Sequence, residues 1–262
     1  AAVHCVIVGF GLQDVAEKTI FEYENIKGEA LAVPVSNINP YLVDAPDLVL
    51  EKRNQPICLV PTISYGSMAN DDGHLLLDKE QRNALIAAEP ATAPYIRRYM
   101  GAQEFLNNAE RWCLWLKDIS PSLMRSSNEL RHRIEAVRKF RASSNREATR
   151  NLAATPSLFG EDRQPLKSYL LLPKVSSENR PYMPIGFMPS EVIANGSALT
   201  ISDSGHYEMG VLQSKMHMAW MRAVAGRMKS DYQYSAQIVY NNFPWPDIPE
   251  KLEPNQPQTP AH

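Results

Sequence analysis

The strongest pattern of hydrophobic and polar positions lies near the middle of the chain. Leu130, Ile134 and Val137 recur at spacings of four and three residues, so they fall on one stripe of an α-helix. A serine followed three residues later by a glutamate opens this stretch at Ser126, in the arrangement of a capping box. The pattern predicts a long amphipathic helix over residues 127–141.

Two further helices are indicated by end signals and apolar positions. Asp78 is a suitable N-cap residue, and Leu85 and Ile86 lie on the inward side of a helix over residues 78–88. A second long helix is predicted over residues 209–229. Its buried face would consist of Leu212, Met216, Ala219 and Trp220.

Short runs rich in β-branched and aromatic residues predict strands elsewhere. These runs are residues 3–8, 31–35, 48–50, 169–175, 182–188 and 198–201, and the WCLWL run at 112–116 has a similar composition. A polar link, Ser176–Pro181, joins two of them, and residues 20–60 have the composition of a loop-rich excursion. Strands mixed with two long helices predict an α+β (mixed α/β) fold, a loop-rich β-sheet domain.

Length and composition are those of an ordinary soluble protein. The 262 residues suffice for one large domain or two modest ones, and 44% are hydrophobic and 21% charged. No run approaches the roughly 18 apolar residues that a membrane span requires. The apolar N-terminus AAVHCVIVGFG lacks the basic segment of a signal peptide, so we expect a buried strand there and no membrane partner.

The three cysteines, Cys5, Cys58 and Cys113, are widely spaced and include no CxxC pair. This spacing argues against a zinc ribbon and against a disulfide framework. We expect three buried, unpaired thiols in a reducing, cytoplasmic protein.

The net charge of −2 conceals an uneven distribution. Residues 125–180 carry 12 Lys and Arg against 6 Asp and Glu, whereas residues 1–124 carry 10 against 16. A local basic excess attracts polyanions such as nucleic acid, although a solvated helix face that balances an acidic neighbour has the same composition.

Catalytic motifs are weak in this chain. Gly9 and Gly11 follow the first predicted strand, but no helix with a third glycine follows them, so they do not form a cofactor-binding turn. Asn39-Pro40-Tyr41 lacks the second proline of the loop with which amino-methyltransferases grip their target amine, and an ordinary turn is the simpler interpretation. There is no GxSxG elbow and no HxxxH zinc pair.

Two alternatives to nucleic-acid binding stay open at this point. One is an atypical hydrolase that uses Ser214 or His217, although His217 is better explained as a packed or capping residue. The other is a protein-interaction domain that docks a partner on the Met-rich segment Met209–Met228.

Polar clusters suited to gripping DNA are more numerous. Ser176-Ser177-Glu178-Asn179-Arg180 places several base-reading side chains in one link, since arginine reads guanine, asparagine reads adenine and a carboxylate accepts from cytosine. Arg97-Arg98-Tyr99 adds two cations and an aromatic ring. Together with the basic middle segment, these clusters favour DNA binding.

Several long strings resemble the MmeI-like DNA methyltransferases, and the resemblance runs from about residue 1 to residue 246. The strings are ISYGSMANDDGHLLL (63–77), APYIRRYMGAQEFLNNAERWCLWL (93–116), LRHRIEAVRKFR (130–141), LAATPSLFGE (152–161), PKVSSENRPYMPIGF (173–187), SKMHMAWMRAVAGRMKSDYQYS (214–235) and VYNNFPWP (239–246).

The resemblance implies a place in a larger bacterial restriction–modification enzyme. Members of that family join a nuclease, a helical linker, an adenine methyltransferase domain and a C-terminal target recognition domain. Residues 1–11 would be the last strand region of the methyltransferase domain, 12–175 the first part of the recognition domain, 176–246 its end with a C-terminal helical segment, and 247–262 a disordered tail.

The same resemblance assigns the chemistry to the upstream methyltransferase domain, which would be the partner of this chain together with double-stranded DNA. S-adenosylmethionine would bind that domain, so we expect no cofactor and no catalytic residue in this chain. The parent would be an adenine-specific DNA methyltransferase and, in some members, an endonuclease.

The expected DNA-facing residues lie on loops and on basic helix flanks. Phosphate contacts are expected from Arg131, Arg138, Lys139 and Lys174. Base-reading or DNA-facing roles are expected for Ser64, Tyr65, Asn70, Asp71, Arg97, Arg98, Ser176, Ser177, Glu178, Asn179 and Arg180. Lys215 and Arg222, which share heptad spacing, complete the set, and Glu191, Asn195 and Asp203 are further candidate readers.

Overall fold

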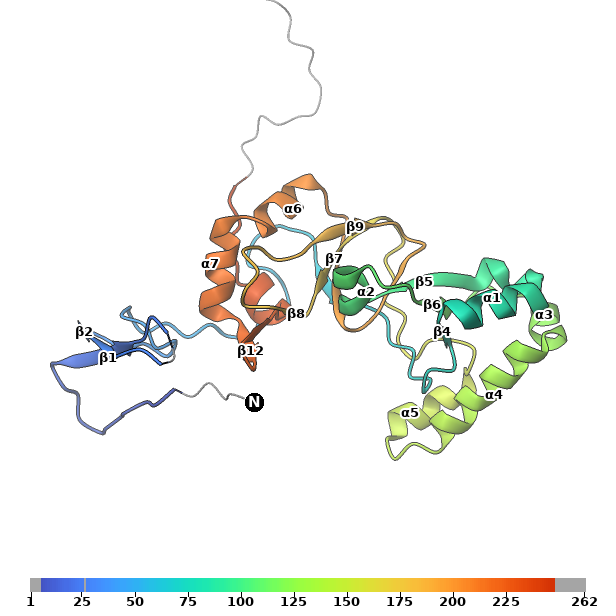
Figure 1. The fold of residues 1–262 in the computed structure, drawn as a ribbon, viewed down its shortest axis with the longest axis horizontal. Coiled ribbons are helices and arrows are strands. Elements are labelled where there is room, and N and C mark those ends of the chain that lie inside the picture. The colour runs from blue at the N-terminus through green and yellow to red at the C-terminus, as the bar shows by residue number, and fades with distance from the viewer. Residues whose placement is uncertain (1–5, 26, 248–262) are drawn as a thin grey trace, which may run out of the picture.

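The computed structural model describes residues 6–25 and 27–247, in which helices mix with several small sheets (Figure 1). The α+β class is therefore confirmed. Three parts follow one another along the longest axis (Figure 1). We call them the N-terminal arm (residues 6–43), the sheet lobe (residues 164–192 and 195–247 with strand β3) and the helical lobe (residues 69–160 with strand β10).

The central sheet of the sheet lobe is antiparallel, with the strand order β3-β11-β7-β9. Alternate residues of a strand face opposite sides, so Leu170 and Leu172 join one core whereas Tyr169 and Leu171 join another. The sheet thus separates two packed layers. Its strands are β3 (Ile63–Tyr65), β7 (Tyr169–Pro173), β9 (Gly186–Met188) and β11 (Ala198–Ser202).

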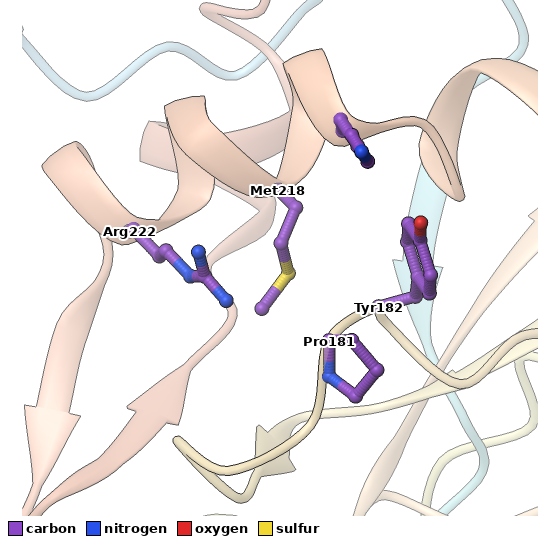
Figure 2. Close-up of a pocket in the computed structure, with 5 residues that line it drawn as sticks. Pro181, Tyr182, Met218 and Arg222 are labelled. Atoms are coloured by element: carbon purple, nitrogen blue, oxygen red, sulfur yellow. The ribbon is translucent and has the colours of Figure 1, made fainter.

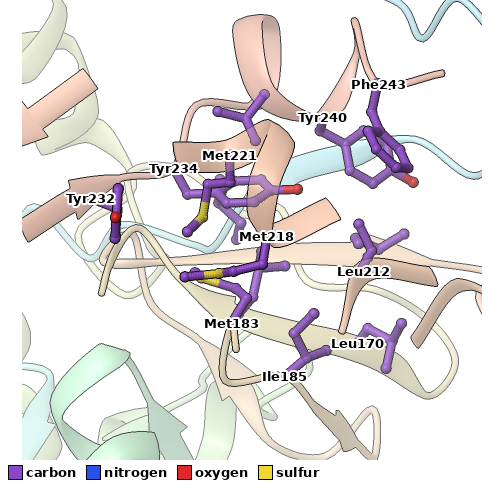
Figure 3. Packing of buried hydrophobic residues seen from close by; sticks show 14 of the residues in the cluster. Leu170, Met183, Ile185, Leu212, Met218, Met221, Tyr232, Tyr234, Tyr240 and Phe243 are labelled. Carbon is purple, nitrogen blue, oxygen red and sulfur yellow. The ribbon is translucent and has the colours of Figure 1, made fainter. Parts of the chain in front are cut away.

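One face of this sheet is covered by helices that close a core rich in methionine and aromatic side chains (Figure 3). Met218 and Met221 pack there with Tyr234, Tyr240 and Phe243. Large aromatic side chains bury much apolar surface, so they dominate the stability of this layer. The covering elements are α6 (His206–Leu212), α7 (Lys215–Val224) and the π-helix η3 (Ala236–Tyr240).

The Asn-Asn-Phe-Pro-Trp turn after η3 anchors the C-terminal segment on this core. Phe243 and Trp245 are buried. The side-chain amide of Asn241 donates to the Arg53 carbonyl (2.7 Å), and the Ile57 N–H donates to the Asn241 carbonyl (2.9 Å). The turn therefore also fixes the segment that leads into β3.

The helical lobe is built on a second sheet with the order β10-β5-β6-β4, in which β10 runs parallel to β5 and the other neighbours are antiparallel. Leu130, Ile134 and Val137 of α4 are buried in the core of this lobe. Its elements are β4 (Leu76–Leu77), α1 (Lys79–Ala88), η1 (Pro90–Tyr95), β5 (Ile96–Met100), α2 (Ala102–Asn107), β6 (Trp112–Leu114), α3 (Pro121–Ser126), α4 (Asn128–Ala142), α5 (Glu147–Asn151), η2 (Leu152–Ala154) and β10 (Ile193–Ala194).

Two smaller sheets complete the fold of the described residues. The hairpin β1-β2 forms the N-terminal arm, and a three-stranded sheet with the order β12-β13-β8 borders α7. These strands are β1 (Lys18–Glu22), β2 (Leu31–Val35), β8 (Val175–Ser176), β12 (Gly226–Met228) and β13 (Asp231–Gln233).

Several predicted elements are confirmed. Strand β2 matches residues 31–35, β7 and β11 match two of the predicted apolar runs, and β6 lies in the WCLWL run. Helix α1 carries the expected cap, because the Asp78 carboxylate accepts from the Gln81 N–H (2.8 Å). The apolar stripe of α4 is also buried as expected.

The cap of α4 lies one residue later than predicted. Ser127 accepts from the Leu130 N–H (3.0 Å), whereas Ser126 donates to the Leu123 carbonyl at the end of α3. The Glu89 carboxylate accepts from the Asn128 N–H (3.1 Å), so an acidic group from a neighbouring turn also stabilises this helix start.

The prediction of one long helix over residues 209–229 is wrong. Helix α6 ends at Leu212 and α7 begins at Lys215, because the Ser214 side chain accepts from the His217 N–H (3.1 Å) and starts a new helix. The break rotates the buried face, so Met216 is exposed and His217 is buried.

Three strand predictions also change. Residues 48–50 form no strand, and only Gly186–Met188 of the run 182–188 is a strand. Of the predicted strand 3–8, residues 6–8 are exposed without regular structure, and residues 3–5 lie outside the described residues. The predicted tail 247–262 also lies outside them, apart from Asp247.

Candidate nucleic-acid interface

A small cationic pocket forms where the link between β8 and β9 meets helix α7 (Figure 2). It has a volume of about 270 Å³, and Lys215 and Arg222 contribute the charged part of its lining. Both residues are exposed, and neither forms an ion pair with another described residue. The apolar part of the lining consists of Pro181, Tyr182 and Met218. A site with two free cations beside an aromatic ring is suited to a phosphate and its sugar.

The turn that precedes this pocket presents polar side chains to solvent. The Arg180 N–H donates to the Ser177 carbonyl (3.1 Å), and the Asn179 N–H donates to the Ser177 hydroxyl (3.3 Å). These bonds leave Glu178 and Asn179 exposed at the tip. Ser176 differs, because it is 2% exposed and belongs to strand β8.

A second cluster lies at β3, an edge strand of the central sheet. The Lys174 ammonium lies 4.9 Å from the centroid of the Tyr65 ring, and the Arg163 guanidinium lies 6.0 Å from it. Ser64 and Tyr65 are exposed. The structure thus brings together three predicted residues and adds Arg163, whose role no local sequence signal indicated.

The loop that contains Asn70 and Asp71 is shaped from within the protein. Asn70 has a positive φ of 50°, and the Asp71 carboxylate accepts from the Leu75 N–H (2.6 Å). Because Asp71 is only 5% exposed, its side chain orders the loop and does not face solvent. Asp72, at the next position, is exposed.

Arg141 organises this loop from the end of α4. Its side chain is fully buried, and its nitrogens donate to five backbone carbonyl oxygens at 2.7–3.0 Å. Burial lowers the pKa of Arg141, and the nearby Asp71 carboxylate opposes that effect. The five acceptors are Ala69, Asn70, Leu152, Thr155 and Leu158. A sequence signal that could have identified it is its position four residues after Val137, on the apolar stripe of α4.

The predicted arginines of β5 lie on the helical lobe. Arg98 lies 6.0 Å from the ring centroid of Trp112, whose ring also has the Arg82 guanidinium at 5.1 Å. Arg97 is opposite Cys113 in the β5–β6 register and is half-buried. These arginines therefore form part of the packed surface of β5, β6 and α1.

The three cations of α4 that were predicted to face DNA, Arg131, Arg138 and Lys139, are exposed, but two of them have polar partners. Arg138 forms an ion pair with Glu135 (2.8 Å), and Arg131 donates to the Asn128 side chain (2.5 Å). Lys139 is exposed with no ion-pair partner among the described residues. Helices α4 and α7 lie on opposite sides of the body, so the predicted cations divide into two groups (Figure 1).

The three further candidate readers occupy different environments. Asn195 accepts from the Ser197 hydroxyl (2.6 Å), and it lies so close to Gly66 and Gly101 that a Cβ on either glycine would overlap it. Asp203 pairs with Lys167 (3.6 Å), whereas Glu191 is exposed on the loop before β10. Asn195 therefore holds the two sheets together.

The geometry does not support the hydrolase alternative. The Ser214 hydroxyl accepts a backbone N–H at the start of α7, and the His217 ring instead lies 3.0 Å (Nε2 to Oη) from Tyr234. Burial lowers the pKa of His217 to about 4. A fully buried imidazole that pairs with a buried tyrosine hydroxyl, and not with Ser214, is a core residue.

The Met-rich segment likewise serves the protein's own core. Met218 and Met221 are buried in it, and Met209 packs against it. Met216 is exposed, but no continuous methionine face is left for a partner helix. This arrangement removes the main support for a protein-interaction domain built on α7.

Other classes of site find little support within residues 6–25 and 27–247. No group of three or more metal-ligating side chains occurs there, and none of the helices in this part is long and apolar enough to cross a bilayer. Cys113 is buried and Cys58 half-buried, and both are unpaired, whereas Cys5 lies outside the described residues.

Comparisons with known proteins agree with one another. The family model "MmeI, target recognition domain" matches residues 44–247. The DNA methyltransferase A of Bacillus subtilis (strain 168) is 38% identical over 249 residues, which are 95% of this chain and 28% of that protein. A structure of the type IIL restriction-modification enzyme MmeI in complex with DNA is 47% identical, with a TM-score of 0.90 over 96% of this chain and 34% of that chain.

The chain thus spans about a third or less of the length of the relatives it matches. The resemblance drawn from the sequence is confirmed, because the family model covers far more than half of the chain. The chain belongs to the MmeI target recognition domain family.

Proposed function

We propose that this chain reads the target sequence of a DNA methyltransferase by binding duplex DNA through the sheet lobe. The observation that carries the proposal is the position of the turn Glu178–Arg180, in which Glu178 and Asn179 are exposed and Arg180 is half-buried, directly before the cationic pocket of Lys215 and Arg222. One surface then offers side chains that read bases next to cations that bind phosphate.

Phosphate contacts come mainly from residues without an ion-pair partner in the described chain. Lys215 and Arg222 bind one backbone phosphate at the pocket, with Tyr182 against the sugar. Lys174, over the ring of Tyr65, binds a second phosphate. Arg131 and Lys139 of α4 are supporting contacts farther along the duplex, where Arg138 is already neutralised by Glu135.

Base readout is assigned to the turn. An arginine at position 180 is suited to the two acceptors of guanine, Asn179 to adenine, and Glu178 to the amino group of cytosine. Each bidentate contact of this kind contributes roughly 1–3 kcal/mol of discrimination. Asp71 and Ser176 are buried and are therefore left out of the DNA-facing set.

The parent activity is proposed from the relatives. We assign adenine-specific methyl transfer to a cytoplasmic parent enzyme, whose catalytic domain acts on the base that this chain selects. Some members of the family also carry an endonuclease. S-adenosylmethionine supplies the methyl group. Gly9 and Gly11 lead into residues 12–17 without a helix, so these two glycines do not form the strand-to-helix turn that binds this cofactor.

Selection of bound duplexes from a random pool tests the assignment. With Arg180→Ala, one position of the selected sequence should lose its preference. With Arg222→Ala, the same sequence should be selected, but all duplexes should bind more weakly and with a smaller salt dependence. Unchanged sequence preference with Arg180→Ala, or unchanged affinity with Arg222→Ala, would refute the proposal.

A further inference from the structure

The hairpin of β12 and β13 carries an exposed methionine between two basic residues. Met228 is 52% exposed, and Arg227 and Lys229 flank it without an ion-pair partner among the described residues. The hairpin follows directly on α7 and lies at its lower end (Figure 1). Edge strands use charged residues to prevent aggregation, which would explain the two cations. It does not explain the apolar side chain between them.

Local contacts hold the hairpin in one shape. The Arg227 guanidinium lies 3.8 Å from the centroid of the Tyr232 ring and donates to the Ser230 carbonyl (2.9 Å). Arg227 is opposite Tyr232 in the β12–β13 register, so both side chains face the body of the protein, where Tyr232 is buried. Successive residues of a strand face opposite sides, so Met228 faces away from the body.

A lysine occupies a loop position that glycine or asparagine usually takes. Lys229 is the first of the two loop residues and has a positive φ of 58°. Most side chains are strained in this conformation, and such strain is retained mainly at functional sites. The loop thus holds an ammonium group beside Met228 at the tip of the hairpin.

The sheet register places this tip beside the proposed base-reading turn. Strands β13 and β8 are antiparallel, with Tyr232 opposite Ser176. The chain therefore leaves β8 towards the end of the sheet from which β13 comes, and the turn Glu178–Arg180 and the hairpin tip extend from that same end. Arg222 of the cationic pocket lies only four residues before Gly226, the first residue of the hairpin.

Charge and size favour nucleic acid as the partner of the tip. Residues Gly226–Gln233 carry two cations and one carboxylate, that of the half-buried Asp231. Met228 is the one exposed large apolar side chain of these strands, which is too little for a protein interface. Single apolar side chains, methionine among them, are what DNA-binding proteins insert between base pairs from the minor groove.

We propose that Met228 is a wedge that enters the minor groove beside the sequence read by Glu178–Arg180 and partly unstacks one base step. Lys229 binds the phosphate next to that step, and Arg227 braces the hairpin. This inference rests on the proposed function and adds a second kind of specificity. Flexible pyrimidine–purine steps such as TA are deformed at the lowest cost, so the hairpin selects a step whose base edges the turn does not contact.

A fluorescent base analogue tests the wedge in duplexes bound by the full 262-residue chain. 2-Aminopurine replaces adenine at one position at a time on both flanks of the selected sequence, and its fluorescence rises when stacking is lost. We expect a rise of roughly twofold or more at one flanking step. Met228→Ala should abolish the rise and Met228→Leu should retain it. The control Met216→Ala, which removes a methionine of similar exposure (56%) from α7, should leave it unchanged.

Competition between duplexes gives a second measurement. At the unstacked step, the wild-type chain should bind a TA step roughly three- to tenfold more tightly than an AA step. Met228→Ala should bind the two duplexes equally. Its salt dependence should equal that of the wild type, because no phosphate contact is removed.

The outcomes separate the wedge from the proposed function. Selective DNA binding without a fluorescence rise at any flanking step would overturn the wedge alone. So would a rise that persists in Met228→Ala, because another part of the chain would then cause the unstacking. A rise that depends on Met228, in a chain whose binding is unaffected by Arg180→Ala and Arg222→Ala, would support the wedge and refute the proposed base-reading site. Absence of duplex binding would overturn both.

Discussion

The sheet lobe and the helical lobe use their charged residues differently. In the helical lobe, Arg141 donates to five carbonyls, Arg133 pairs with Glu129, and Arg138 pairs with Glu135. In the sheet lobe, Lys215 and Arg222 have no ion-pair partner among the described residues. The most basic stretch of sequence is thus largely engaged in structure, whereas the two pocket cations that we propose bind phosphate, Lys215 and Arg222, lie where the sequence is nearly neutral.

The largest effect is expected on the stability of the helical lobe. Arg141→Met removes all five donors while keeping the length of the side chain, so buried carbonyls lose their partners. We expect the free energy of unfolding to fall by about 3–5 kcal/mol, which denaturant titration measures. A loss below about 1 kcal/mol would show that water replaces the guanidinium.

The next effect concerns the sheet lobe and depends on pH. Burial lowers the pKa of His217 to about 4 from 6.5, so the unfolded chain takes up a proton first as the pH falls. Stability from this residue is therefore complete above pH 6.5 and is lost towards pH 4, by an amount on the order of 3 kcal/mol. Thermal unfolding of His217→Gln should lack this part of the pH dependence. The same slope in wild type and variant would contradict it.

The two lobes can be separated by their effect on DNA affinity. The Lys215→Ala/Arg222→Ala variant should make the slope of log affinity against log salt shallower by about 1, because the contacts to one phosphate are lost. The matched Arg131→Ala/Lys139→Ala variant in α4 should change the slope by less than half as much. Filter binding over a salt series measures both, and an inverted order would move the interface to the helical lobe.

The smallest effect is expected at the surface of α4. Arg138→Ala removes the exposed ion pair between Arg138 and Glu135, which lie three residues apart on one helix. We therefore expect the free energy of unfolding to change by about 0.5 kcal/mol or less. Denaturant titration beside Arg141→Met gives a direct contrast within the same helix. A larger loss would show that Arg138 has a structural role that its contacts do not indicate.

Local patterns in the sequence predicted the elements that depend on local physics. The stripe of Leu130, Ile134 and Val137 located α4, and Asp78 located the start of α1. The helix break at Ser214 was missed, because the methionine-rich periodicity continues through it while the serine side chain caps a new helix. A capping residue inside a periodic run is ambiguous until tertiary packing decides.

The site was harder to predict, because pairing between distant residues decides which polar groups remain free. Asp71 and Ser176 are residue types that can contact DNA bases, but both side chains are buried inside the protein. The Arg163 guanidinium packs over the ring of Tyr65, although the two residues are about a hundred positions apart in the sequence. The Asn241 side chain donates to the backbone carbonyl of Arg53. The resemblance to the MmeI-like enzymes predicted the class of function, and residue type predicted the polar link Ser176–Pro181, but neither predicted these long-range contacts.

Photochemical crosslinking to DNA tests the central claim most directly. A photoreactive phenylalanine analogue at position 179, in the exposed turn, is compared with the same analogue at Asn145, an exposed residue of the helical lobe. We predict that position 179 crosslinks to one fixed base of the target sequence and that position 145 gives no sequence-dependent product. Crosslinks from position 145 to a fixed base, with none from position 179, would contradict the assignment of sequence recognition to the sheet lobe.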